Sequence, residues 1–185
     1  MIHDFEQKFE FSLGEREQFD IRLIKKILPG CVDIQKTDDE QDIAGIDYVA
    51  MLRGGATVNI DAKTREKGAS RYWKNNEPEL ALEIWSVVPD DRHTGKTGWT
   101  LSESSNVDYI LYTFDSSDCN KFFFLPFQLL RTAFRDNCSD WCEQYAVKTQ
   151  HSNNWDSRAV FVPAPVVIAE INRLMTGIAY YQYSV

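Results

Sequence analysis

Residues 45–63 read Gly-Ile-Asp-Tyr-Val-Ala-Met-Leu-Arg-Gly-Gly-Ala-Thr-Val-Asn-Ile-Asp-Ala-Lys, and this stretch decides the fold. An apolar run follows Asp47 and ends before the pair Gly54–Gly55, which is a strong turn signal. After the turn, apolar and polar residues alternate up to Lys63, as in a strand with one buried face. The pattern predicts an antiparallel β-hairpin that carries two aspartates and a lysine.

The alternation along the second strand of this hairpin predicts where its charged side chains lie. Because strand side chains alternate with a period of two, Asp61 and Lys63 project from one face and Ala62 projects from the other. Pairing with the first strand brings Asp47 close to Asp61. The two carboxylates and the Ala62 carbonyl are hard oxygen ligands suited to Mg²⁺ or Mn²⁺. Lys63 would lie beside the metal, where its ammonium orients a water or neutralises charge on a phosphate.

This arrangement resembles the PD-(D/E)xK nuclease superfamily, which has the restriction-endonuclease-like fold. Asp47 matches the first acid of that motif, Asp61 the second acid and Lys63 the lysine, while Ile46 stands where the motif has proline. The resemblance extends more loosely from the first helix to the strand that ends near Phe114. It implies a Mg²⁺-dependent deoxyribonuclease, with DNA as the substrate.

The chain length and the order of elements predict one domain over residues 1–185, because nothing in the sequence divides it. We expect a mixed α/β fold of the α+β kind, with a central mixed β-sheet of at least four strands flanked by helices. Residues 95–98 read as a mobile loop, and 99–105 as a short helix. Outside the hairpin, the expected helices cover 12–28, 126–145 and a closing segment to 175, and the expected strands cover 31–35, 79–88, 107–114, 121–125, 146–150 and 158–162.

Further acids are candidates for the same site. Glu17 and Asp20 fall at helical spacing from the apolar stripe of the first helix, so one of them could lean inward. In the nucleases that this chain resembles, a glutamate of the first helix often supports the metal, which makes Glu17 a candidate; a solvated first-turn acid is the alternative. Glu83 lies inside an expected strand, where a buried acid needs a partner such as the metal or Lys63. An exposed position on the sheet is the alternative for Glu83.

Net charge alone does not indicate a nucleic-acid-binding protein, because the chain carries a formal charge of -8. The stretch 53–74 is an exception, with six basic residues against two acids. Aromatic residues within it could stack on bases, or could equally be half-buried packing. The alternative for the whole stretch is a solvated loop. The expected nucleic-acid contacts are Arg65, Lys67, Arg71, Tyr72, Trp73 and Lys74.

The remaining features bear on location and assembly. No apolar run approaches the ~20 residues that a membrane span needs, and we expect no membrane association. The four cysteines lack metal-binding spacing, so reduced thiols and a cytoplasmic location are expected. The tail 178–185 contains three tyrosines and packs either on the domain or on a partner, for instance in a homodimer.

Two other functions fit the same residues. The first is a non-catalytic interaction or inhibitor module on a nuclease-like fold, in which Asp47, Asp61 and Lys63 form a structural ion cluster. The second is an RNA-directed nuclease with the same chemistry, since no motif in the sequence reads a nucleic-acid groove.

Overall fold

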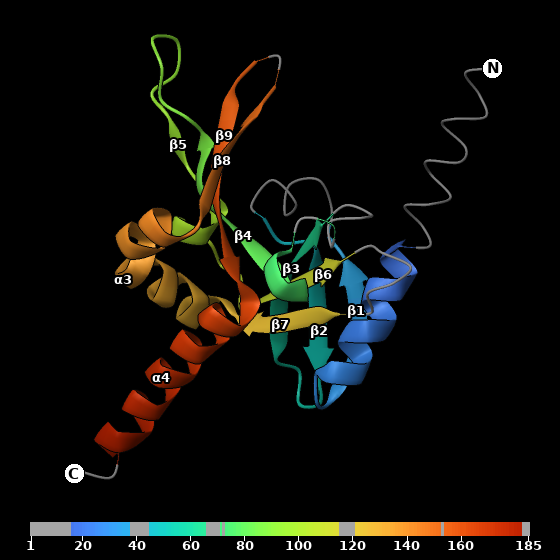
Figure 1. Ribbon diagram of the computed structural model, residues 1–185. Coiled ribbons are helices and arrows are strands. Elements are labelled where there is room, and N and C mark those ends of the chain that lie inside the picture. The colour runs from blue at the N-terminus through green and yellow to red at the C-terminus, as the bar shows by residue number, and fades with distance from the viewer. Residues whose placement is uncertain are drawn as a thin grey trace, which may run out of the picture.

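The computed structural model describes residues 16–37, 45–65, 71, 73–114, 121–152 and 154–182. Within these ranges the chain forms three helices and two β-sheets, a mixed architecture of the α+β kind (Figure 1). The elements in chain order are a helix over 16–27, β1 (Cys31–Lys36), β2 (Tyr48–Leu52), β3 (Thr57–Arg65), the 3₁₀ turn η2 (Lys74–Asn76), β4 (Glu79–Val87), β5 (Lys96–Thr97), the 3₁₀ turn η3 (Trp99–Leu101), β6 (Tyr109–Phe114), β7 (Phe122–Pro126), α3 (Phe127–Gln144), β8 (Ala146–His151), β9 (Asp156–Pro163) and α4 (Ala164–Gln182).

The predicted hairpin is present and forms the centre of a five-stranded sheet. β2 and β3 pair antiparallel, with Tyr48 opposite Ile60. Gly54 and Gly55 adopt φ values of 100° and 86°, a left-handed conformation that glycine reaches at little cost. The strand order is β1-β2-β3-β6-β7, in which β6 runs parallel to β3 and the other neighbours are antiparallel. The parallel pair β3–β6 joins the hairpin to the second half of the chain.

The helix over 16–27 covers one face of this sheet. Ile24 has no exposed surface, and it packs with Tyr48 and Ile60 of the sheet. Leu111 of β6 joins the same cluster, whereas its neighbours Ile110 and Tyr112 belong to a second cluster on the opposite face. This alternation is the period of two that a strand buried on both faces must show. The described part of the helix agrees with the expected range 12–28; its start lies outside the described residues.

The expected central mixed sheet of at least four strands is confirmed, and a second sheet that the sequence did not indicate lies beside it. Four strands, in the order β5-β4-β9-β8, form this separate antiparallel sheet. It was not foreseen because β4 pairs with a strand far along the chain, with Leu80 opposite Val162, and no local signal indicates such a pairing. The expected mobile loop at 95–98 is wrong, since Lys96–Thr97 pair with β4 as β5. The expected helix at 99–105 is shorter, a 3₁₀ turn of three residues.

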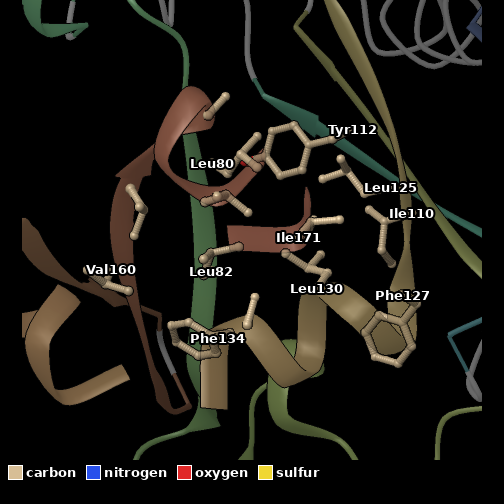
Figure 2. Packing of buried hydrophobic residues seen from close by; sticks show 14 of the residues in the cluster. Leu80, Leu82, Ile110, Tyr112, Leu125, Phe127, Leu130, Phe134, Val160 and Ile171 are labelled. Carbon is tan, nitrogen blue, oxygen red and sulfur yellow. The ribbon is translucent and has the colours of Figure 1, made fainter. Parts of the chain in front are cut away.

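The two sheets share one hydrophobic core with α3 and α4. Figure 2 shows the side chains of β4 and β9 meeting those of β6, β7 and the two helices. Leu82 and Phe134, from β4 and α3, have no exposed surface. Beyond this core, the far ends of β4, β5, β8 and β9 extend away from the helices (Figure 1). The second sheet is therefore anchored at one end and exposed at the other.

The helices and cysteines bear on the expectations about location. No helix in the described part of the chain is both long and apolar enough to cross a membrane. The described cysteines, Cys31, Cys138 and Cys142, are free. The closing helix continues beyond residue 175, because α4 runs to Gln182 and includes the first part of the expected tail.

Replacing Leu82 by alanine tests whether the two sheets fold as one unit. Because Leu82 lies fully buried between β6, β9 and α3, we expect Leu82→Ala to lower the free energy of unfolding by about 2–5 kcal/mol. Urea denaturation, followed by both tryptophan fluorescence and circular dichroism, should still show a single transition. Two separated transitions would contradict the shared core and the single domain expected over 1–185.

Candidate active site

The site lies just before the start of β2, where the backbone hydrogen bonds between β2 and β3 are followed by a hydrogen bond to a side chain. The Asp47 backbone N–H donates to the Ile60 carbonyl at 3.0 Å, and the Asp47 carbonyl accepts from the Thr37 N–H at 3.0 Å. The next free N–H on this edge of β3 belongs to Ala62, and it donates to Asp47 Oδ2 at 2.6 Å. Because the N–H and C=O of one strand residue point to the same side, the Ala62 carbonyl also faces this edge. Asp47 is thereby fixed in both backbone and side chain.

Asp61 and Lys63 project from one face of β3, as the sequence pattern predicted. Lys63 Nζ lies 2.6 Å from Asp61 Oδ1. The Asp61 side chain is almost fully buried, while about a third of the Lys63 side chain remains exposed. Register with β6 places both residues beside Ile110 and Tyr112, on the face that meets the second sheet. The acid is therefore enclosed, and the lysine connects it to the surface.

Electrostatics in this group favour a proton or a cation on Asp61. Burial is the largest cause that raises the pKa of Asp61, to about 7. The Lys63 ammonium opposes the shift, and the Asp47 carboxylate, which is bonded to the neighbouring Ala62 N–H, adds to it. Asp47 and Asp61 are thus close neighbours across the hairpin, the relation that the sequence predicted. Ionising both of two neighbouring carboxylates is unfavourable unless a positive charge is shared between them.

One atom of this group fits a bound cation. Asp61 Oδ1 is buried and lies 2.6 Å from the Lys63 ammonium, so it already has a positively charged neighbour. A carboxylate oxygen is a hard ligand that a divalent cation can contact as well. Within the described ranges, no three histidine, cysteine or acidic side chains converge as a metal cluster. The hard ligands here are the carboxylates of Asp47 and Asp61 with the Ala62 carbonyl.

The acid of the first helix that leans inward is Asp20, and the role of Glu17 beside the metal stays a prediction. Glu17 lies beside Lys36, with 3.6 Å between Oε2 and Nζ, and about two fifths of its side chain is exposed. Asp20 is buried and accepts a hydrogen bond from the Tyr48 hydroxyl at 3.3 Å. Burial raises the pKa of Asp20, and the charge of Asp47 adds to the rise. Helical spacing left both Glu17 and Asp20 as candidates, and only the rotation of the helix on the sheet decides which of them faces inward.

Arg16 fixes the position of Asp20 from the same helix. Its Nε lies 3.3 Å from Asp20 Oδ2, and its Nη2 donates to the hydroxyls of Thr64 and Thr113. These threonines belong to β3 and β6, on the face opposite to Asp61. Sequence reasoning missed Arg16, because its partners are distant in the chain.

Glu83 bonds to Ser86 and to the turn η3, and its role beside the metal stays a prediction. Glu83 Oε2 accepts hydrogen bonds from the Ser86 hydroxyl at 2.6 Å and from the Trp99 N–H at 3.1 Å. It therefore holds the turn η3 against β4. The ring of Trp99 in turn lies under Lys63, with 5.6 Å between Nζ and the ring centroid, a cation–π distance. Glu83 contributes to the site through the support of Lys63.

The expected nucleic-acid contacts are placed unevenly. Arg65 is the last residue of β3, and its guanidinium lies 4.9 Å from the ring centroid of Phe161. Arg71 is exposed. Trp73 is half-buried and packs edge-to-face on Phe114 at 5.1 Å, so the packing alternative describes it. Of the other three, Lys67 and Tyr72 lie outside the described residues, as does the side chain of Lys74, whose backbone belongs to η2.

Stability should depend on pH through Asp61 when no divalent metal is present. Its pKa in the folded protein, about 7, lies above the ordinary value of 3.8, so the folded state binds more protons between these values. The free energy of unfolding should therefore fall as pH rises through this window. Asp61→Asn removes the ionisation. Between pH 4 and pH 8, we expect the free energy of unfolding of this variant to rise by about 2–4 kcal/mol relative to that of wild type.

Urea titrations in EDTA across this pH range measure the difference between wild type and Asp61→Asn. Asp33→Asn serves as the matched control, because Asp33 is an exposed acid on β1 of the same sheet. A difference between wild type and Asp61→Asn that stays constant with pH would contradict the buried acid.

The turn that supports Lys63 leaves no room for a side chain at Gly98. A Cβ added there would lie 2.2 Å from the carbonyl oxygen of Glu83. We expect Gly98→Ala to lower the free energy of unfolding by about 1–3 kcal/mol, because backbone must shift to admit the methyl group. Thr97→Ala, at the exposed neighbouring position, should change it by less than about 1 kcal/mol. Thermal denaturation of both variants measures this, and equal stabilities would show that η3 is free to move.

Comparisons with protein-family models, with curated proteins and with solved structures found no match to this chain. The candidate site is therefore defined by its own geometry: two neighbouring carboxylates, a strand carbonyl and a lysine supported by an aromatic ring.

Proposed function

We propose that this protein is a metal-dependent nuclease that hydrolyses phosphodiester bonds in DNA. The observation that carries the proposal is the contact of Lys63 with the buried Asp61, at 2.6 Å, beside a second carboxylate from Asp47. The order of helix, strand, hairpin and parallel strand around these residues supports a restriction-endonuclease-like core. The additional four-stranded sheet would be an elaboration of that core.

Asp47, Asp61 and the Ala62 carbonyl would hold the Mg²⁺ or Mn²⁺ ion. Such an ion, when bound, lowers the pKa of a coordinated water and polarises phosphate oxygens. The fit rests on ligand chemistry, since all three groups are hard oxygen donors, and on the Asp47 carboxylate lying against the Ala62 N–H beside Asp61. A divalent charge would also favour the ionised form of Asp61, whose pKa burial raises to about 7.

Lys63 is the chain's own reactive group in this proposal. Its ammonium is held between the Asp61 carboxylate and the Trp99 ring, so it is oriented before substrate arrives. Because about a third of its side chain is exposed, it can reach a phosphate oxygen or an attacking water. A fixed positive charge at this position stabilises the negative charge that develops on the phosphate in the transition state.

Two other functions remain to be separated from this one by experiment. A non-catalytic interaction module would keep the ion cluster for structure, and it would bind no divalent metal. Such a cluster is costly, because the buried Asp61, the half-buried Asp47 and one lysine leave an excess of negative charge. An RNA-directed nuclease would use the same residues, and only the substrate would differ. DNA as the substrate, a homodimer and a cytoplasmic location stay predictions.

Substitution of the three residues should give two distinct results. Asp47→Ala and Asp61→Ala should abolish metal binding and cleavage together, because each removes one carboxylate ligand. Lys63→Ala should still bind metal, while cleavage slows by about 10²–10⁴-fold, the usual effect of losing a positioned charge or proton-transfer group. Calorimetry with Mg²⁺ or Mn²⁺, beside cleavage of supercoiled, linear and single-stranded DNA and of RNA, measures both properties.

Matched controls come from the same sheet. Asp33→Ala removes an exposed acid, and Lys36→Ala removes a lysine that is more than half exposed; both should behave as wild type. If folded wild-type protein binds no divalent metal and cuts none of these nucleic acids, or if Lys63→Ala cuts as fast as wild type, the nuclease proposal fails. The interaction module then becomes the better account.

A further inference from the structure

A row of charged side chains leads away from the candidate site along β3. Asp61, Lys63 and Arg65 alternate with residues of the opposite face, so they share one face of the strand. Their register partners on β6 are Ile110, Tyr112 and Phe114, all of which belong to the core cluster between the two sheets. The row therefore runs toward the second sheet and ends at Arg65.

Arg65 meets the second sheet at an aromatic ring that a further cation also contacts. The guanidinium carbon of Arg65 lies 4.9 Å, and the ammonium of Lys148 4.7 Å, from the centroid of Phe161. Cross-strand neighbours of Phe161 are Ala81 and Ala146, whose small side chains leave the ring uncovered. We call Arg65, Phe161 and Lys148 the cation–aromatic cluster.

This cluster lies on the outward face of the second sheet. Val160 and Val162, which flank Phe161 along β9, are fully buried in the shared core, so Phe161 points the other way. Phe161 is only half-buried, and Lys148 is exposed. A ligand can therefore reach the ring and both cations from solvent.

The charges of the cluster call for an anion. Contacts with one ring hold the two cations within about 10 Å of each other, the Debye length at 0.1 M salt, so their repulsion is not fully screened. Among the residues that the structure describes, no carboxylate forms an ion pair with Arg65, although the chain carries 28 acids. Two cations held close together at one half-buried ring attract an external anion.

We propose that the cation–aromatic cluster is a docking surface for the phosphate backbone of a nucleic acid, leading from the candidate site across the outward face of β9 and β8. This inference rests on the proposed nuclease function and adds the path of the substrate. Lys63 and Arg65 would contact phosphates next to the site, and Lys148 would contact phosphates farther along. The ring of Phe161 holds Arg65 and Lys148 near one another by cation–π contacts.

The path differs from the one that the sequence indicated. The basic stretch 53–74 suggested that the connection after β3 contacts DNA, whereas Trp73 of that connection packs on the core. Lys148 lies in β8, outside the stretch, and gives no sequence signal of its own. Only the pairing of β8 with β9 brings it to Arg65 through Phe161.

The test uses the full chain with Asp61→Asn as background, in EDTA, so that no substrate is cut. Fluorescence anisotropy measures binding of labelled single-stranded and duplex DNA of equal length between 50 and 200 mM salt, on the order of the range in which phosphate contacts are lost. Arg65→Gln with Lys148→Gln removes both cations of the cluster. The matched control is Lys25→Gln with Lys26→Gln, two exposed lysines of the helix over 16–27 that remove the same charge elsewhere.

We expect the cluster variant to bind at least about tenfold more weakly than the control, with a salt dependence of log Kd that is smaller by about two, one for each lost phosphate contact. Lys148→Gln alone, at an exposed position that should not affect folding, should give about half of the change in slope. Arg65→Lys, which keeps the charge, should bind nearly as wild type.

Equal affinities and equal salt slopes for the cluster variant and the control would overturn this inference, while cleavage by the wild type would leave the proposed function intact. A wild type that neither binds nor cuts nucleic acid would overturn both. The two failures are therefore distinguishable.

Discussion

The hydrogen bond from the Ala62 N–H to the Asp47 carboxylate is the interaction on which the candidate site depends. Every buried backbone donor needs a partner, and β3 continues past the point where the antiparallel β2 begins. A side chain from the residue before β2 supplies that partner, so Asp47 does for Ala62 what a further strand residue would otherwise do. The same bond places a negative charge near Asp61, which adds to the rise in the pKa of Asp61 that burial causes first.

The two faces of β3 pack on different layers on either side of this bond. One face carries Ile60 and Ala62 and packs on the helix over 16–27, with Thr64 bonded to Arg16 at its end. The other face carries Asp61 and Lys63 toward the second sheet, where Trp99 supports the lysine. Each face thus has its own supporting layer, and both layers are fixed by residues outside the hairpin. An Asp-x-Lys sequence without these layers would leave its lysine free to rotate, because lysine has four rotatable bonds and few constraints of its own.

Local chemistry made part of this structure predictable from sequence. The hairpin followed from Gly54–Gly55 and the alternation after it, and the shared face of Asp61 and Lys63 followed from the period of a strand. The partners of Glu83, the Ser86 hydroxyl and the Trp99 N–H, were not foreseen, because the contact of β4 with that turn depends on packing. The choice between Glu17 and Asp20 depended on how the first helix rotates against the sheet. Such features depend on packing between distant segments, which spacing along the chain does not contain.

The strands of the two sheets alternate along the chain, and this order affects how the protein folds during synthesis on the ribosome. All five strands of the first sheet are present once the chain reaches Pro126, but β4 acquires its partner only when β9 has been made, since Leu80 pairs with Val162. At about 5–20 residues per second, synthesis leaves an apolar strand edge exposed for several seconds. Closing so large a loop is entropically costly and slow compared with forming a hairpin. The nascent chain is therefore most vulnerable to misassembly at β4, far from the residues of the candidate site.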